Sequence, residues 1–278
     1  MHDPRQRKQR IDRILVDRGL AESRQKAAAL LMAGRVLVDG KLVSKAGAQV
    51  PVESSIDVKK PAYDFVSRAG DKLNTALDRF GVEIRGKVCM DIGASTGGFT
   101  ECLLERGAKL VYAIDVGYGQ LAHKLRIRTD VVPIERTNIR HFDGSALEYH
   151  PEFATIDVSF ISLRLVLPKA FELLTENGEV VALIKPQFEV GKGQVGKGGI
   201  VRDVTLHRSV LQEIAEFSRG IGLHPAGITA SSIRGQKGNQ EYLFYGSKQA
   251  GPGQDLSERI EEALLQANSN EDTQCSRP

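Results

Sequence analysis

The spacing of apolar residues near the N-terminus predicts a small α+β unit over residues 1–58. The stretch "IDRILVDRGL" has the apolar spacing of a short amphipathic helix, and "RQKAAALLMA" reads as a second helix with Ser23 as its cap. In "RVLVDGKLV", apolar residues alternate around Asp39-Gly40, a pair that favours the type I′ turn of a hairpin. A further strand near "SIDVKK" completes the unit.

After residue 86 the pattern changes to strands that alternate with helices. Five apolar runs predict strands, in "KVCMDIG", "KLVYAIDVG", "DVVPIERTN", "FATIDVSF" and "EVVALIKP". This alternation predicts an α/β fold with an open, mostly parallel sheet. Two final strands follow, in "AGITASSIRG" and "EYLFYGSK", and we expect the last to be antiparallel. A helix opened by Ser67, patterned "SRAGDKLNTALDRFG", precedes the sheet.

These patterns divide the chain into four parts. Pro61 in "KKPAYDF" interrupts regular structure, so residues 59–64 are predicted to be an interdomain linker. The larger domain is placed at 65–250. The polar tail, 251–278, is expected to be partly helical and then disordered.

The composition narrows the class of protein. Of the 278 residues, 41% are hydrophobic, yet no apolar run reaches the length of a membrane span, and "MHDPRQRKQR" lacks the apolar core of a signal peptide. The three cysteines form neither a disulfide framework nor a metal-ligand pattern. We therefore expect a cytoplasmic protein without a metal or a membrane partner.

The charge is uneven along the chain. Residues 1–60 contain 13 Lys and Arg against 7 Asp and Glu, whereas the rest contains 25 against 28. A basic module beside a mildly acidic body indicates a polyanionic partner, although a solvated basic face gives the same count. Residues 1–60 contain no aromatic side chain, so a nucleic-acid partner would be bound by its phosphates through one cationic face, formed by Arg10, Arg13, Arg24, Lys26 and Arg35.

The loop "DIGASTGGFT" is the first candidate for chemistry. It lacks the second glycine of a dinucleotide motif and the G-K-[ST] of a phosphate loop. What remains is the D-x-G-x-x-x-G pattern of S-adenosylmethionine enzymes; a purely structural turn is the alternative. An acid at the end of the next strand suits ribose hydroxyls. The predicted cofactor-binding residues are Asp91, Gly93, Ser95, Gly97, Gly98, Phe99, Asp115 and Asn138.

Further charged residues stand at the ends of predicted strands. Asp157 ends the fourth strand and Lys185 the fifth, where a lysine that only extends its ammonium group to solvent is the alternative interpretation. If the last strand is antiparallel, Glu241 at its start lies at the same edge of the sheet. Lys72, on the helix before the sheet, is the fourth member of this group. We expect all four to converge on one crevice.

The order of these motifs resembles a known family. "SRAGDKL", "DIGASTGGFT", "IDVSFISL", "LIKPQFE" and "NQEYLF", behind a module similar to the S-four type of RNA-binding domain, resemble the TlyA family of ribosomal-RNA 2′-O-methyltransferases, also labelled haemolysin A. The body resembles the wider FtsJ-like methyltransferases. The resemblance implies a Rossmann-like domain that binds S-adenosyl-L-methionine, a catalytic tetrad of Lys72, Asp157, Lys185 and Glu241, and methylation of cytidine 2′-hydroxyls in ribosomal RNA or ribosomal subunits.

Several residues complete this interpretation. A lysine flanked by carboxylates is a poor base, so Lys185 is expected to position the 2′-oxygen and stabilise its charge, with a role as base left open. The glycine-rich stretch 189–201 is predicted to be a loop, which either closes over RNA or only connects two elements of the fold. Arg68, Lys192 and Lys197 are further candidate RNA contacts. Phe188 is placed either against a base or in the core, and His207 at the surface.

Two other classes of function stay open at this point. One is a membrane-active haemolysin, which the second family label suggests but which lacks support from a span or a strongly amphipathic basic helix. The other is a non-catalytic RNA-binding assembly factor. The oligomeric state is not predicted.

Overall fold

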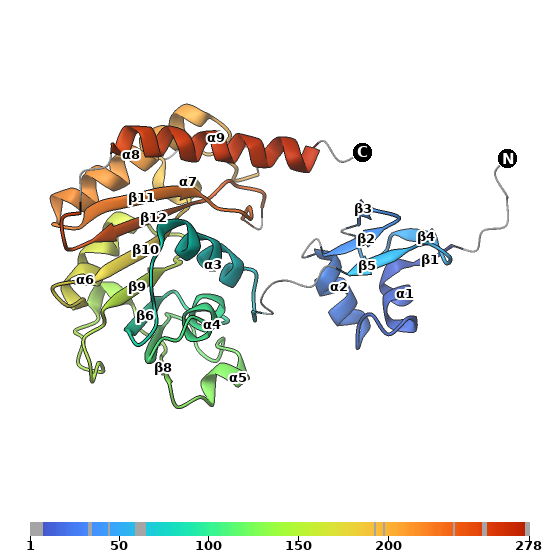
Figure 1. Cartoon of the computed structure of the whole chain (residues 1–278), viewed down its shortest axis with the longest axis horizontal. Helices are drawn as coiled ribbons and strands as arrows, with labels where there is room; N and C mark the ends of the chain where they lie inside the picture. The colour runs from blue at the N-terminus through green and yellow to red at the C-terminus, as the bar shows by residue number, and fades with distance from the viewer. Residues whose placement is uncertain are drawn as a thin grey trace. The chain divides into compact units, whose positions relative to one another are not determined.

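The computed structural model describes residues 8–32, 35–43, 45–58, 65–191, 193–196, 198–235, 237–251 and 255–275 (Figure 1). The chain divides into two compact units, and the second of them spans Phe65–Asp272. The linker predicted at 59–64 lies outside the described residues. The two units are described separately.

The first unit packs two helices against short strands. Helices α1 (Ile11–Asp17) and α2 (Arg24–Met32) bury Ile11, Leu15 and Leu31 together with the strand residue Val36. One sheet has the order β3-β2-β5, with β2 (Val36–Val38), β3 (Lys41–Leu42) and β5 (Ile56–Val58). The predicted hairpin is confirmed, because β2 and β3 pair around Asp39 and Gly40, which both have positive φ.

A second, two-stranded sheet of this unit was not predicted. It pairs β1 (Lys8–Arg10) with β4 (Gln49–Pro51) in antiparallel register. Both strands have three residues, which is too short for an alternating pattern to be recognised in the sequence.

The larger unit is built on a seven-stranded sheet with the order β11-β12-β10-β9-β6-β7-β8. The strands are β6 (Val88–Ile92), β7 (Leu110–Ile114), β8 (Val131–Ile134), β9 (Phe153–Ile156), β10 (Glu179–Ile184), β11 (His224–Ala230) and β12 (Tyr242–Ser247). The strands from β6 to β10 pair in parallel, whereas β12 lies antiparallel between β10 and β11. The predicted α/β fold, with its antiparallel last strand, is confirmed.

Helices cover both faces of this sheet (Figure 1). They are α3 (Ala69–Phe80), α4 (Gly98–Glu105), α5 (His123–Arg126), α6 (Leu167–Leu173), α7 (Pro186–Glu189), α8 (Val204–Gly220) and α9 (Leu256–Cys275), with short 3₁₀ turns η1 (Ile139–His141) and η2 (Leu163–Leu165). Helices α3 and α4 pack on one face with Val181 and Leu183, whereas α6, α8 and α9 pack on the other with Val180 and Ala182. Alternate residues of β10 therefore serve two cores.

The C-terminal helix and His207 both contribute to the interior of the larger unit. The tail, expected to be partly helical and then disordered, is helical from Leu256 to Cys275. Its apolar residues Ile260, Ala263, Leu264 and Ala267 have helical spacing and are buried in the core of the sheet. His207, expected at the surface, lies on the buried face of α8, 2.7 Å from the hydroxyl of Tyr242.

Candidate active site

A cleft of about 620 Å³ opens at the edge of the sheet where the parallel strands end. The wall includes residues that follow β6, β9 and β10, residues that precede α3 and β12, and Lys72 on α3. All four residues of the predicted tetrad line it: Lys72, Asp157, Lys185 and Glu241. The volume is within the usual range for a small-ligand site.

Lys185 and Asp157 form the first ion pair of the cleft. They follow the neighbouring parallel strands β10 and β9, which places their side chains next to each other. Lys185 Nζ lies 2.6 Å from Asp157 Oδ1 and donates a second hydrogen bond to Ser159 Oγ at 3.0 Å. The ammonium group is thus held by two oxygens from one loop, which fixes its position in the wall of the cleft.

Lys72 and Glu241 form the second ion pair, which is more deeply buried. Lys72 lies in the first turn of α3, and Glu241 directly precedes β12. Their Nζ and Oε2 atoms are 2.5 Å apart, and the side chains are only 7% and 5% exposed. Because β12 runs antiparallel to β10, with Tyr242 opposite Ile184, Glu241 stands at the same edge as Lys185.

The glycine loop after β6 forms another wall. Gly93 has φ of +84°, and a Cβ there would meet the carbonyl oxygen of Asp157 at 2.5 Å. A Cβ on Gly98, the first residue of α4, would meet Ser67 Oγ at 2.2 Å. Both glycines therefore let the backbone lie close to its neighbours. Gly93, Ser95, Gly98 and Phe99 line the cleft.

Other predicted cofactor residues lie close to this loop without lining the described cleft. Asp91 is fully buried beneath it, where its carboxyl accepts hydrogen bonds from Thr100 Oγ1 at 2.7 Å and Thr155 Oγ1 at 3.0 Å. Burial raises the pKa of Asp91 to about 7, against the opposing effect of the two hydroxyl groups. Gly97, with φ of +97°, is the N-cap residue of α4.

Asp115 and Asn138 stand after neighbouring strands, as predicted. Asp115 Oδ2 accepts from the backbone N–H of Ser95 at 2.8 Å, and Oδ1 accepts from the N–H of Gly117 at 2.6 Å. Asp115 therefore connects the loops that follow β6 and β7. Asn138 is exposed and caps η1 by accepting from the N–H of Arg140.

The structure adds cleft residues that were not predicted. They include Ser159, Phe160, Gln187, Lys237 and Asn239. Phe160 is 89% exposed, has φ of +64°, and its ring centroid lies 5.0 Å from that of Phe188. The sequence placed Phe160 at the end of the strand predicted in "FATIDVSF", and a left-handed backbone at a residue other than glycine leaves no signal in the sequence.

The basic residues of the first unit are partly neutralised. Arg10 and Arg24 both donate to the buried carboxylate of Asp12, at 2.9 and 3.1 Å, and the hydrogen bond from Arg10 holds the pKa of Asp12 well below its ordinary value. Arg13 lies 3.8 Å from Asp17. Lys26 is exposed and Arg35 is half-buried.

The candidate RNA contacts of the larger unit are only partly described. Arg68 lines the cleft, whereas Lys192 and Lys197 lie outside the described residues. In the described part of the stretch 189–201, only Glu189 belongs to a helix, and Val195 and Gly199 line the cleft.

Among the described residues, no group of three or more His, Cys, Asp or Glu side chains could hold a metal ion. None of the helices that these residues form combines the length and the apolar character needed to cross a bilayer.

Comparison with protein families gives two matches. The model described as FtsJ-like methyltransferase matches residues 65–248, and the model described as S4 domain matches residues 9–56.

Relatives match over nearly the whole chain. The Mycobacterium tuberculosis protein named "16S/23S rRNA (cytidine-2'-O)-methyltransferase TlyA" is 45% identical, over 86% of this chain and 90% of its own. "Hemolysin A" of Brachyspira hyodysenteriae is 42% identical, over 85% and 98%. A solved structure named "Putative hemolysin from Streptococcus thermophilus" has a TM-score of 0.77 and 39% identity, and the match covers 98% of this chain and 99% of that one.

Proposed function

The chain belongs to the TlyA family of rRNA methyltransferases, and from this membership we propose that it transfers the methyl group of S-adenosylmethionine to the ribose 2′-hydroxyl of a cytidine in ribosomal RNA. The observation that carries the proposal is the presence of two Lys–carboxylate pairs in one cleft beside the glycine loop. Such a substrate implies that the protein acts in the cytoplasm.

The walls of the cleft fit the proposed cofactor. S-adenosylmethionine has no phosphate to bind, and the loop offers backbone and small residues at Gly93, Ser95 and Gly98, with Phe99 beside them. Asp115, held by the same loop, is suited to a ribose hydroxyl. The bound cofactor would supply an electrophilic methyl group.

Lys185 is the residue that we assign to the 2′-oxygen. Asp157 and Ser159 hold its Nζ in place, so the ammonium group can orient the hydroxyl and stabilise the negative charge that develops on the oxygen. Lys72 and Glu241 would add a second fixed pair of charges to the same wall. Phe160, which is exposed, and the half-buried Phe188 beside it offer aromatic surface on which a base could stack.

RNA would also contact the first unit. Its arginines, oriented by Asp12, suit phosphates rather than base edges. We propose that this unit provides affinity for ribosomal RNA, while Arg68 in the cleft wall contacts the RNA near the reactive nucleotide.

The experiment measures two steps separately. Calorimetry with S-adenosylmethionine tests cofactor binding, and transfer of a labelled methyl group to ribosomal RNA, mapped by mass spectrometry, tests the reaction. Asp157→Ala and Lys185→Ala should keep cofactor binding and lose transfer by at least about 100-fold. The proposal would be contradicted if the unmodified protein transferred no methyl group to ribosomal RNA. It would also be contradicted if both variants transferred the methyl group as fast as the unmodified protein.

A further inference from the structure

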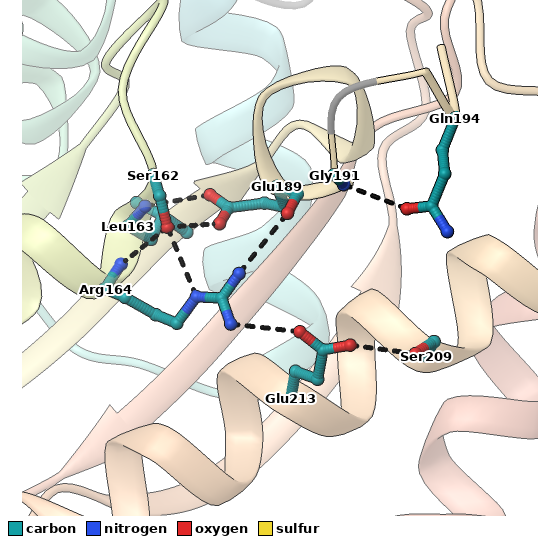
Figure 2. A network of polar contacts seen from close by, with 8 residues as sticks. All are labelled: Ser162, Leu163, Arg164, Glu189, Gly191, Gln194, Ser209 and Glu213. Carbon is teal, nitrogen blue, oxygen red and sulfur yellow. Dashed lines mark hydrogen bonds and ion pairs between the residues drawn. The ribbon is translucent and has the colours of Figure 1, made fainter. Parts of the chain in front are cut away.

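Two segments that leave the sheet side by side are joined at several points. One follows β9 and contains Asp157 to Leu163, and the other is Lys185 with α7. At one end Lys185 bonds to Asp157 and Ser159, as described above. At the other end, Glu189 accepts hydrogen bonds from Ser162 Oγ at 2.5 Å and from the backbone N–H of Leu163 at 2.8 Å (Figure 2).

Glu189 is a buried carboxylate without a role in the chemistry proposed above. It is the last residue of α7, is 8% exposed, and is not among the described residues that line the cleft. Burial raises its pKa, and the donors Ser162 and Leu163 oppose the effect. A buried carboxylate is costly unless such donors compensate it, so the two hydrogen bonds hold the segments together.

Arg164 extends this connection to the core. Its Nη2 donates to the carbonyl oxygen of Glu189 at 3.3 Å, and its Nη1 lies 3.0 Å from Glu213 Oε2 on α8. Ser209, one turn earlier on α8, donates to the same carboxylate (Figure 2). The far end of the segment is therefore attached to a helix that packs against the sheet.

The segment between these attachments contains an unfavourable backbone conformation. Phe160 has φ of +64°, which costs a residue other than glycine free energy of order 1 kcal/mol or more. Such a conformation persists only where neighbouring contacts fix it. Ser159, the partner of Lys185, directly precedes this residue, and Ser162, the partner of Glu189, follows it by two positions.

We propose that Glu189 is a positioning residue for methyl transfer. By holding Ser162 and Leu163, it fixes the loop that presents Asp157 and Ser159 to Lys185, although it touches neither RNA nor cofactor. This inference rests on the proposed function, because Lys185 is the group whose placement matters. Displacement of a reacting group by about 1 Å can cost about 100-fold in rate, so a loose loop would lower kcat.

The test compares three variants of the full chain. Glu189→Ala removes both acceptors. Glu189→Gln keeps the size and an oxygen for Leu163, and its amide can donate to the hydroxyl of Ser162. Glu179→Ala is the matched control, since Glu179 begins the same strand that Lys185 follows, bonds to Lys87 and Tyr245, and lies at the opposite edge of the sheet.

Five quantities are measured: kcat and KM for ribosomal RNA, the Kd of S-adenosylmethionine, the free energy of unfolding, and hydrogen–deuterium exchange of the peptide covering 157–165. For Glu189→Ala we expect kcat to fall by about 10- to 100-fold, the Kd to change by less than about threefold, and exchange to become faster. Glu189→Gln should retain most of kcat. Glu179→Ala should lose stability without a comparable loss of kcat.

Two outcomes would overturn the inference. One is unchanged exchange of residues 157–165 in Glu189→Ala. The other is a fall in kcat that is equal for Glu189→Ala and Glu179→Ala at equal loss of stability. If the unmodified protein methylates no ribosomal RNA, the proposed function fails, whereas exchange still shows separately whether Glu189 fixes the loop.

Discussion

Lys72 and Glu241, 169 positions apart in the sequence, form an ion pair of 2.5 Å whose two side chains are almost completely buried. Removal of either partner leaves a buried charge without compensation, which is far more costly than loss of the attraction alone. The pair therefore links the fold of the larger unit to the chemistry of the cleft.

Substitution Lys72→Met should lower the free energy of unfolding by about 3–5 kcal/mol, because the carboxylate of Glu241 loses its partner. The double variant with Glu241→Met should recover most of this loss, since an apolar pair of similar volume needs no compensation. Methyl transfer should be lost in both. Urea unfolding followed by circular dichroism and a transfer assay distinguish the two effects.

The control for this prediction is Lys169→Met, the same change in a pair whose other member, Glu172, has an exposed side chain. It should cost less than about 1 kcal/mol. A double variant that is as unstable as the single one, or that regains methyl transfer, would show that the buried pair has another role.

Substitution Ser159→Ala tests the second contact of Lys185. The ammonium group keeps Asp157 but loses the hydrogen bond at 3.0 Å, so we expect kcat to fall by about tenfold with cofactor affinity unchanged. Ser247→Ala, at the far end of β12, is a control that should leave kcat unchanged. A fall as large as that of Lys185→Ala would mean that Ser159 itself takes part in the reaction.

The sequence was sufficient to predict the convergence of the four charged residues, because parallel strands place their carboxyl ends at one edge of a sheet. The alternation of strands and helices predicts that Asp157 and Lys185 lie at this edge, and an antiparallel last strand places Glu241 at the same edge. The glycine pattern predicts that the loop after β6 lies beside these residues, since few residues other than glycine fit the backbone of this loop.

Other features could not be predicted because they depend on side-chain placement. The contact of Ser159 with Lys185 and that of Ser162 with Glu189 depend on the conformation of a short loop with a left-handed residue. The periodicity of the sequence does not predict this conformation. His207 has an ordinary position in an amphipathic helix, and its burial is compensated by the hydroxyl of Tyr242 and the carbonyl oxygen of Val201, which lie next to its two ring nitrogens. The tail was expected to be only partly helical because few of its residues are apolar, but Ile260, Ala263 and Leu264 have the spacing of one buried helix face.

The buried carboxyl group of Asp91 predicts a particular dependence of stability on pH. Its pKa is raised from 3.8 to about 7, so the folded protein favours the protonated form. Its contribution to stability should be complete below about pH 4, should fall as the pH rises toward 7, and should be constant above. Over this range the loss would be at most about 4 kcal/mol.

The variant Asp91→Asn removes this titration. The free energy of unfolding of the unmodified protein, minus that of the variant, should therefore decrease between pH 4 and pH 7. Denaturant unfolding at several pH values measures the difference. A difference that is independent of pH, or that grows as the pH rises, would show that Asp91 is ionised in the folded protein over this range.

Substitution Gly93→Ala should damage the cofactor site. The new Cβ would lie 2.5 Å from the carbonyl oxygen of Asp157, in a backbone with φ of +84°, so the loop has to move. We expect the Kd of S-adenosylmethionine to rise by at least about tenfold. Gly81→Ala is the control: it has φ of +65° but no atom within 4 Å of its Cβ, so it should cost about 1 kcal/mol of stability and leave the Kd unchanged.

The exposed Lys26 of the first unit tests how this unit binds RNA. A residue that contacts a phosphate releases counterions on binding, so Lys26→Ala should weaken binding to a ribosomal RNA fragment and reduce the slope of log K against log salt concentration by about 1. The effect should be the same for fragments of different sequence, because phosphate contacts do not read bases. Filter binding at several salt concentrations measures both quantities.

Lys169→Ala, in the larger unit, is the control and should leave the slope unchanged. Loss of affinity for only one RNA sequence, at an unchanged slope, would instead assign Lys26 to a base contact.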